Sequence, residues 1–116
     1  MTLYDKVDPT TAEFVAVATP EELPNGARKI VEVEGRAIAV FNIAGTLYAI
    51  ADVCSHDDGP VAEGELEGYE IECPRHGARF DVRDGRVLSF PAIVNIPAYP
   101  VKVENGEVWV GLPPQD

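Results

Sequence analysis

The sequence predicts an all-β fold of antiparallel strands in one domain of 116 residues. Short segments that alternate apolar and polar residues recur along the chain, and glycine-containing pairs separate them. The pair Asn105-Gly106 lies between two such segments, which is the strongest short-range hairpin signal in the chain. No long segment has the periodicity of an amphipathic helix. We therefore expect successive strands to pair with their neighbours in the sequence.

The first half of the chain predicts four strands and one helical turn. Residues 1–12 are polar and form a loosely held lead-in, and residues 14–18 form the first strand. Residues 19–23 combine a capping threonine, a proline at the first helical position and two glutamates, which predicts a single helical turn. Strands follow over residues 28–33, 36–43 and 46–50, with turns at Glu34-Gly35 and Ala44-Gly45.

The second half predicts shorter elements. Residues 65–72 form a short acidic segment with Tyr69 and Ile71 on one face, and residues 79–86 form a hairpin that turns at Asp84-Gly85. The final hairpin pairs residues 99–104 with residues 107–111, and the tail after it is loosely held.

All the cysteines and histidines of the chain lie between positions 54 and 76. They form the motifs Cys54-Ser55-His56 and Cys73-Pro74-Arg75-His76-Gly77, separated by sixteen residues. Thiolate and imidazole are ligands that iron and zinc prefer, so this clustering predicts a metal centre.

The motif is compatible with three kinds of site. A structural zinc site usually pairs cysteine with cysteine and histidine with histidine, whereas each half here supplies one of each. That mixed spacing favours a [2Fe–2S] cluster in which two cysteines hold one iron and two histidines the other. A catalytic Cys–His pair would leave the second pair unexplained.

The motif C-x-H…C-P-x-H-G resembles that of the Rieske iron–sulfur proteins, and most closely the small Rieske ferredoxins of bacterial ring-hydroxylating oxygenases. The resemblance runs from about residue 14 to residue 112. It implies an antiparallel β-sandwich base with a small inserted cluster-binding subdomain at about residues 51–92. It implies that Cys54 and Cys73 ligate the inner iron, and that His56 and His76 ligate the outer iron near the surface. Residues 89–92 resemble the family's proline-bearing third loop, which covers the cluster.

The resemblance also shows what this chain lacks. High-potential relatives carry a disulfide where this sequence has Gly59 and Arg75, and hydroxyl donors where it has Ala78 and Phe80. Hydrogen bonds to the sulfurs stabilise the reduced state, so their absence implies a potential at the low end of the Rieske range.

Charge and hydropathy exclude several functions. The net charge of −11 argues against nucleic-acid binding, which needs a basic surface. No apolar run approaches the length of a membrane span, and the first residues lack an export signal. With both cysteines assigned to metal, none remains for a disulfide, which favours the cytoplasm.

We therefore expect a monomeric one-electron carrier, not an enzyme in its own right. By resemblance it would pass electrons from an NAD(P)H-dependent reductase to a terminal non-haem iron oxygenase, docking through the His56/His76 tip. Acidic Asp57 and Asp58 beside that tip are candidates for docking. Two alternatives are a small Rieske-like subunit of a larger oxidoreductase, such as nitrite reductase, and a zinc-stabilised binding module.

Overall fold

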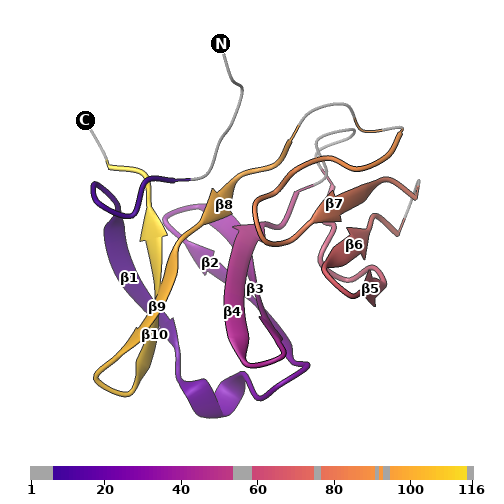
Figure 1. Cartoon of the computed structure of the whole chain (residues 1–116). Helices are drawn as coiled ribbons and strands as arrows, with labels where there is room; N and C mark the ends of the chain where they lie inside the picture. The colour runs from indigo at the N-terminus through magenta and orange to yellow at the C-terminus, as the bar shows by residue number, and fades with distance from the viewer. Residues whose placement is uncertain (1–6, 54–58, 75–76, 91, 93–94, 115–116) are drawn as a thin grey trace.

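The structure is a computed structural model that describes residues 7–53, 59–74, 77–90, 92 and 95–114 (Figure 1). The described elements are ten strands and one short 3₁₀ helix. In chain order they are β1 (Glu13–Ala18), η1 (Pro20–Glu22), β2 (Arg28–Val33), β3 (Arg36–Ile43), β4 (Thr46–Ala51), β5 (Leu66–Glu67), β6 (Glu70–Glu72), β7 (Arg79–Asp81), β8 (Ala98–Tyr99), β9 (Val101–Glu104) and β10 (Glu107–Leu112). The prediction of an all-β fold is confirmed.

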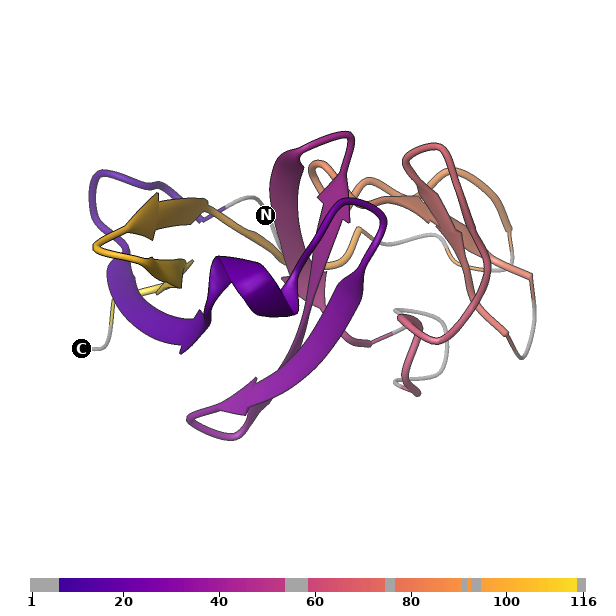
Figure 2. The ribbon, with the colours of Figure 1, turned by 90° about the horizontal axis from the view of Figure 1, so that it is seen from below.

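The strands form three antiparallel sheets. One sheet has the order β1-β10-β9, a second has the order β2-β3-β4-β8, and the third has the order β5-β6-β7. The first two form the base, and the third lies at the opposite end of the molecule from β1 (Figures 1 and 2). The small third sheet lies within residues 51–92, the range in which the resemblance implies a cluster-binding subdomain.

The predicted turns are confirmed at the base hairpins. Asn105 and Gly106 both adopt positive φ angles, 55° and 74°, between the paired residues Glu104 and Glu107. Successive positive φ angles give the turn whose twist matches that of the flanking strands. Glu34-Gly35 and Ala44-Gly45 use the same arrangement, which explains why β2, β3 and β4 pair in chain order.

Strand β3 is buried on both faces. Ile38 and Val40 pack with β4 and with Val108 and Val110 of β10, in the core between the two base sheets. The alternate residues, Ala39 and Phe41, pack in a second core with residues of the small sheet. Because successive side chains of a strand point to opposite faces, this one strand joins the base core to the cluster-binding end.

Two predicted elements differ from the structure. Residues 99–104 were expected to form one strand, but Tyr99 pairs with Ala49 in one sheet, whereas Val101 pairs with Val110 in another. Pro100 lies between them, and its lack of an N–H removes a ladder hydrogen bond at the point where the chain changes sheets.

The hairpin expected over residues 79–86 has a regular strand on one side only. Strand β7 ends at Asp81, and Val87 of the returning segment forms a single bridge with Phe80. Two backbone hydrogen bonds flank this bridge, from the Asp81 N–H to the Arg86 oxygen at 2.9 Å and from the Leu88 N–H to the Arg79 oxygen at 2.8 Å. The Asp81 side chain accepts a hydrogen bond from the Arg83 backbone N–H at 2.9 Å, and its backbone oxygen accepts one from Gly85 at 2.7 Å, which closes the turn between the two segments.

Within the part of the chain that the structure describes, no helix is long and apolar enough to cross a membrane.

Candidate metal centre

The second predicted ligand loop is the connection between β6 and β7. Glu72 pairs with Arg79, so residues 73–78 form the loop of this hairpin. The Cys73 N–H donates to the Ala78 oxygen at 2.7 Å, and the Gly77 N–H donates to the Cys73 oxygen at 3.0 Å. The β6–β7 pairing therefore fixes where the backbone of Cys73 lies.

Cys73 is the predicted ligand that the structure describes. Its side chain is 1% exposed and carries a free thiol. It packs in a core cluster with Val61, Ala78, Phe80 and Ala92, all of them apolar. Cys54, His56 and His76 lie outside the described residues, as do Asp57, Asp58 and Arg75. The described residues alone contain no group of three or more His, Cys, Asp or Glu side chains that could hold a metal ion.

Asp52 closes the first predicted loop, and sequence reasoning missed this role. Its Oδ1 atom accepts hydrogen bonds from the backbone N–H groups of Val61 at 2.9 Å and Ala62 at 2.7 Å. The Asp52 N–H in turn donates to the Ala37 oxygen of β3 at 2.9 Å. Asp52 therefore brings both ends of the loop together at the base sheet. The available signal was a short acidic side chain just after a strand, a residue type that often bonds nearby backbone N–H groups.

The exit of the first loop meets the start of the second. A Cβ atom placed on Gly64 would lie 1.6 Å from the Glu72 backbone oxygen and 3.2 Å from Pro74 Cδ, so only glycine fits this contact. Arg28 of β2 holds the same exit, because its Nη1 donates to the oxygens of Ala62 at 2.6 Å and Gly64 at 2.8 Å. Sequence analysis did not predict this role of Arg28.

A third segment approaches the same region. The Leu88 N–H donates to the Arg79 oxygen at 2.8 Å, and the Arg79 N–H donates to Ser89 Oγ at 3.1 Å. Two residues after Phe90, Ala92 is 3% exposed and belongs to the core cluster of Cys73. Described residues at or next to each of the three expected loop segments, Val61, Ala78 and Ala92, therefore share a core cluster with Cys73.

These residues fit a [2Fe–2S] group. A thiolate ligand needs a site that excludes water, and the buried apolar surroundings of Cys73 supply it. Both Ala78 and Phe80 are fully buried in that cluster. Neither side chain carries a hydrogen-bond donor, so neither position can donate to a cluster sulfur.

A family model for the Rieske [2Fe-2S] domain matches residues 13–100. The chain belongs to the Rieske [2Fe-2S] family. This membership identifies its cofactor as a Rieske-type [2Fe–2S] cluster, which excludes the zinc interpretation.

Named Rieske relatives and solved Rieske structures are similar over nearly the whole chain. The ferredoxin component of the naphthalene 1,2-dioxygenase system from Pseudomonas aeruginosa is 40% identical over 102 residues, which cover 88% of this chain and 98% of that protein. The ferredoxin of carbazole 1,9a-dioxygenase from Nocardioides aromaticivorans is 35% identical, with a TM-score of 0.79, and the match covers 88% of this chain and 98% of that one. A ferredoxin–oxygenase complex of carbazole 1,9a-dioxygenase matches with 32% identity and a TM-score of 0.80, covering 89% and 96% of the two chains.

The acidic segment of this Rieske domain has a structural role. Glu67, Glu70 and Glu72 lie 3.2, 3.4 and 3.0 Å from the guanidinium of Arg79. These carboxylates raise the pKa of Arg79, chiefly through the hydrogen bond to Glu67. One arginine therefore ties β5, β6 and β7 together, and the three carboxylates leave this edge with net negative charge.

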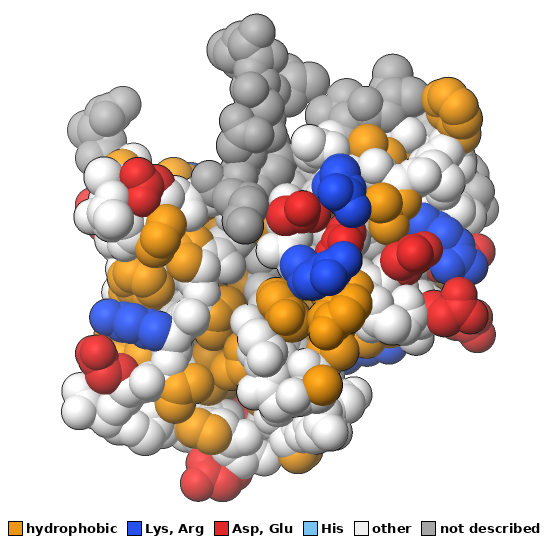
Figure 3. Space-filling model, in the orientation of Figure 1, with side chains coloured by type: hydrophobic (Ala, Val, Ile, Leu, Met, Phe, Trp, Pro, Cys, Tyr) orange, Lys and Arg blue, Asp and Glu red, His pale blue; other side chains and the backbone are white. Residues whose placement is uncertain are grey.

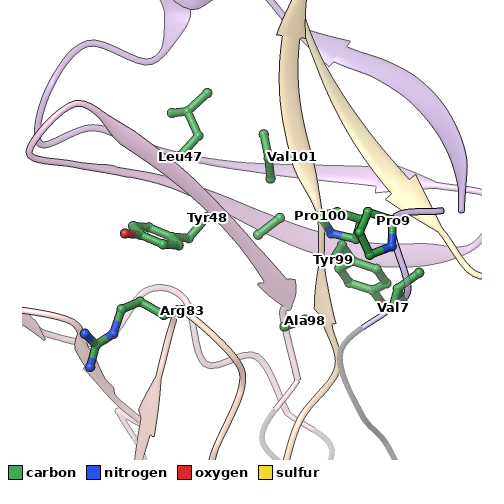
Figure 4. Close-up of a pocket in the computed structure, with 10 residues that line it drawn as sticks. Val7, Pro9, Leu47, Tyr48, Arg83, Ala98, Tyr99, Pro100 and Val101 are labelled. Atoms are coloured by element: carbon green, nitrogen blue, oxygen red, sulfur yellow. The ribbon is translucent and has the colours of Figure 1, made fainter.

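A separate hollow of about 320 Å³ lies between β4, β8 and the segment that carries Val7 and Pro9 (Figure 4). Its lining is apolar apart from Tyr48, Tyr99 and Arg83.

The Arg83 guanidinium is already paired with Asp81 at 2.7 Å and lies over the Tyr69 ring at 4.2 Å. Tyr69 meets Tyr48 of β4 edge-to-face at 5.9 Å. We call Asp81, Arg83, Tyr69 and Tyr48 the brace, because they link the small sheet to the base.

Proposed function

We propose that this protein is a one-electron carrier that delivers electrons to the terminal oxygenase of a ring-hydroxylating dioxygenase system. The observation that carries the proposal is the similarity, over 88% of this chain, to ferredoxin components of such systems. A solved relative in complex with its oxygenase supports the same assignment. On this proposal the protein catalyses no substrate reaction of its own.

We propose Cys54, His56, Cys73 and His76 as the cluster ligands. Support comes from the motif spacing and from the buried, apolar position of Cys73. When bound, the cluster takes up and releases one electron. The chain's contribution is to exclude water around Cys73, to close the first loop through Asp52 and to hold the second loop between β6 and β7.

The remaining expectations belong to the same proposal. An electron carrier receives electrons from an NAD(P)H-dependent reductase and exchanges partners, so we expect a monomer that binds each partner transiently. We place it in the cytoplasm, because both cysteines of the chain are assigned to the cluster and none is left for a disulfide.

The function is tested by reconstitution. The purified protein would replace the native ferredoxin in the naphthalene 1,2-dioxygenase and carbazole 1,9a-dioxygenase systems, with each system's own reductase and oxygenase. We expect substrate oxidation in at least one system, and none when the protein is omitted. Failure in both systems, or a protein that cannot be reduced and reoxidised by one electron, would overturn the proposal.

The ligands are tested one at a time. Replacement of His56 or His76 by alanine should abolish the Rieske signal in electron paramagnetic resonance of the reduced protein, because imidazole ligation of one iron defines that signal. The variant Ser55→Ala, between two proposed ligands, is the matched control and should keep it. A normal signal in either histidine variant would remove that residue from the ligand set.

A further inference from the structure

Phe90 is the most exposed large hydrophobic side chain among the described residues. It is 81% exposed, compared with 55% for Val103 and 41% for Ile30. Large aromatic side chains contribute strongly to protein association when a partner buries them. Its own chain buries little of the Phe90 side chain, so most of the surface of this side chain is available for contact with a partner.

The backbone on both sides of Phe90 is fixed. On one side, Leu88 and Ser89 are hydrogen-bonded to the backbone of Arg79. On the other, Ala92 is buried in the core cluster that contains Cys73. Phe90 therefore projects from an anchored segment, and a partner would not have to order a free loop in order to bind it.

The surroundings of Phe90 are apolar and uncharged. Together with Val87, Leu88, Ser89 and Ala92 it lines an open hollow of about 360 Å³. Ser89 is the only polar residue between positions 87 and 94, in a chain whose net charge is −11. Figure 3 shows hydrophobic side chains exposed at this end of the molecule, beside residues drawn in grey.

Negative charge lies on the small sheet to which the segment of Phe90 is hydrogen-bonded. Arg79, which anchors the segment of Phe90, is surrounded by Glu67, Glu70 and Glu72. An apolar centre with a charged rim is the usual anatomy of a specific protein interface. The complementary partner surface is an apolar pocket with basic residues at its edge.

We propose that Phe90 is the apolar anchor through which the terminal oxygenase docks. This inference rests on the proposed function and names the contact that the function requires. Phe90 lies two residues before Ala92, which shares a core cluster with the proposed ligand Cys73, and an electron donor must bring its metal centre close to its acceptor. An oxygenase whose apolar pocket encloses Phe90 would bring the two metal centres close together. The glutamates would steer its approach.

The test is stopped-flow electron transfer from the chemically reduced ferredoxin to the oxidised oxygenase, as a function of oxygenase concentration. The oxygenase is that of the naphthalene or carbazole system, whichever the parent protein reduces faster, and no reductase is present. The variants are Phe90→Ala, the conservative Phe90→Trp, and Val103→Ala as a matched control. Val103 is exposed and apolar but lies on β9, in the base.

We expect Phe90→Ala to raise the half-saturating oxygenase concentration about tenfold or more. The limiting rate, the paramagnetic resonance spectrum and the reduction potential should stay unchanged. Phe90→Trp should bind nearly as well as the parent, and Val103→Ala should bind equally well.

Equal binding by Phe90→Ala and the parent would overturn this inference alone, as would equal weakening by Val103→Ala. A changed spectrum or potential in Phe90→Ala would also overturn it, because the side chain would then act on the centre and not on the partner. A parent protein that reduces neither oxygenase would overturn both this inference and the proposed function.

Discussion

Ala78 and Phe80 have no side-chain hydroxyl, and both share a core cluster with Cys73. Both side chains are fully buried. A donor to a cluster sulfur would stabilise the reduced, more negative state, so we predict a potential near the low end of the Rieske range, about −150 mV. Such a potential suits a carrier fed by a nicotinamide-dependent reductase.

Installing the donors should raise the potential. The double variant Ala78→Ser/Phe80→Tyr should shift it upward by tens of millivolts, since about 1 kcal/mol corresponds to roughly 40 mV for one electron. Protein-film voltammetry measures the shift. Ala39→Ser, a buried hydroxyl in the same core cluster but on β3, is the control and should leave the potential in place. A parent potential well above zero would contradict this account.

Gly85 is required by both its backbone angle and its neighbours. Its φ is +77°, and a Cβ atom would lie 1.9 Å from the Ile96 oxygen. Gly85→Ala should therefore lower the free energy of unfolding by more than the backbone strain alone, which is about 1–2 kcal/mol. Thermal unfolding of the holo-protein gives the comparison. Gly45→Ala is the control, because its φ is +89° but no atom lies within 4 Å of the added Cβ. Equal losses in the two variants would show that the contact with Ile96 is unimportant.

At the level of elements, the brace is organised around one buried charge. Asp81 is 3% exposed, and its carboxylate bonds Nε of Arg83 at 3.0 Å and Nη2 at 2.7 Å. The hydrogen bond from the Arg83 side chain is the main cause that holds the pKa of Asp81 below its usual value of 3.8. The ionised carboxylate thus fixes Arg83, and Arg83 fixes Tyr69 against Tyr48 of the base.

Asp81→Asn should destabilise the protein by about 1–2 kcal/mol, because the arginines remain partly exposed and no buried charge is left alone. A lowered pKa in the folded state means that the contribution of Asp81 is fully present above about pH 5 and is lost as the pH falls through the lowered pKa. The difference in Tm between parent and variant should therefore be constant from about pH 8 to pH 5.5. A difference that shrinks across that interval would show that Asp81 is not the ionised partner.

Local elements were the predictable part of this fold. Strands β2, β3 and β4 follow one another through turns whose residues tolerate positive φ, so the sequence itself contains their pairing signal. The pairing of Glu13 with Leu112 has no comparable signal, because the two residues meet only when the whole chain is folded. The change of sheet at Pro100 was missed because residues 99–104 look like one continuous strand.

The candidate centre was likewise predictable only in part. Its ligand types and spacing could be predicted from the sequence, because four rare residues in two matching motifs indicate a metal site by themselves. The roles of Asp52 and Arg28 were not, because each acts on backbone atoms that lie 9 or more residues away. The exposure of Phe90 could not be predicted either, because the sequence of an apolar segment does not indicate which of its side chains is exposed to solvent.

For the whole molecule, the two cores predict separate responses to loss of the cluster. Among the described residues, the base core, which includes Ile38, Val40, Val108 and Val110, contains no proposed ligand. The other core contains Cys73. Cluster binding stabilises the folded state by mass action, and it does so at the loops that supply the ligands.

The apo-protein should therefore keep its base sheets and lose order at residues 54–60 and 73–78. In hydrogen exchange, the amides of β3 should stay protected, whereas those of Cys73 and Gly77 should exchange faster than in the holo-protein, although both are hydrogen-bonded in the structure. Equal protection of Cys73 and Gly77 in the two forms would contradict this prediction.

The pairing of β1 with β10 has a consequence for synthesis on the ribosome. Strand β1 is made before its partner β10, so it waits unpaired while about ninety residues are added. The β2–β3–β4 meander needs only local contacts and can form as soon as it leaves the exit tunnel. The β2–β3–β4 sheet beside the proposed centre would thus form during synthesis, whereas the β1–β10–β9 sheet could close only after β10 has left the exit tunnel.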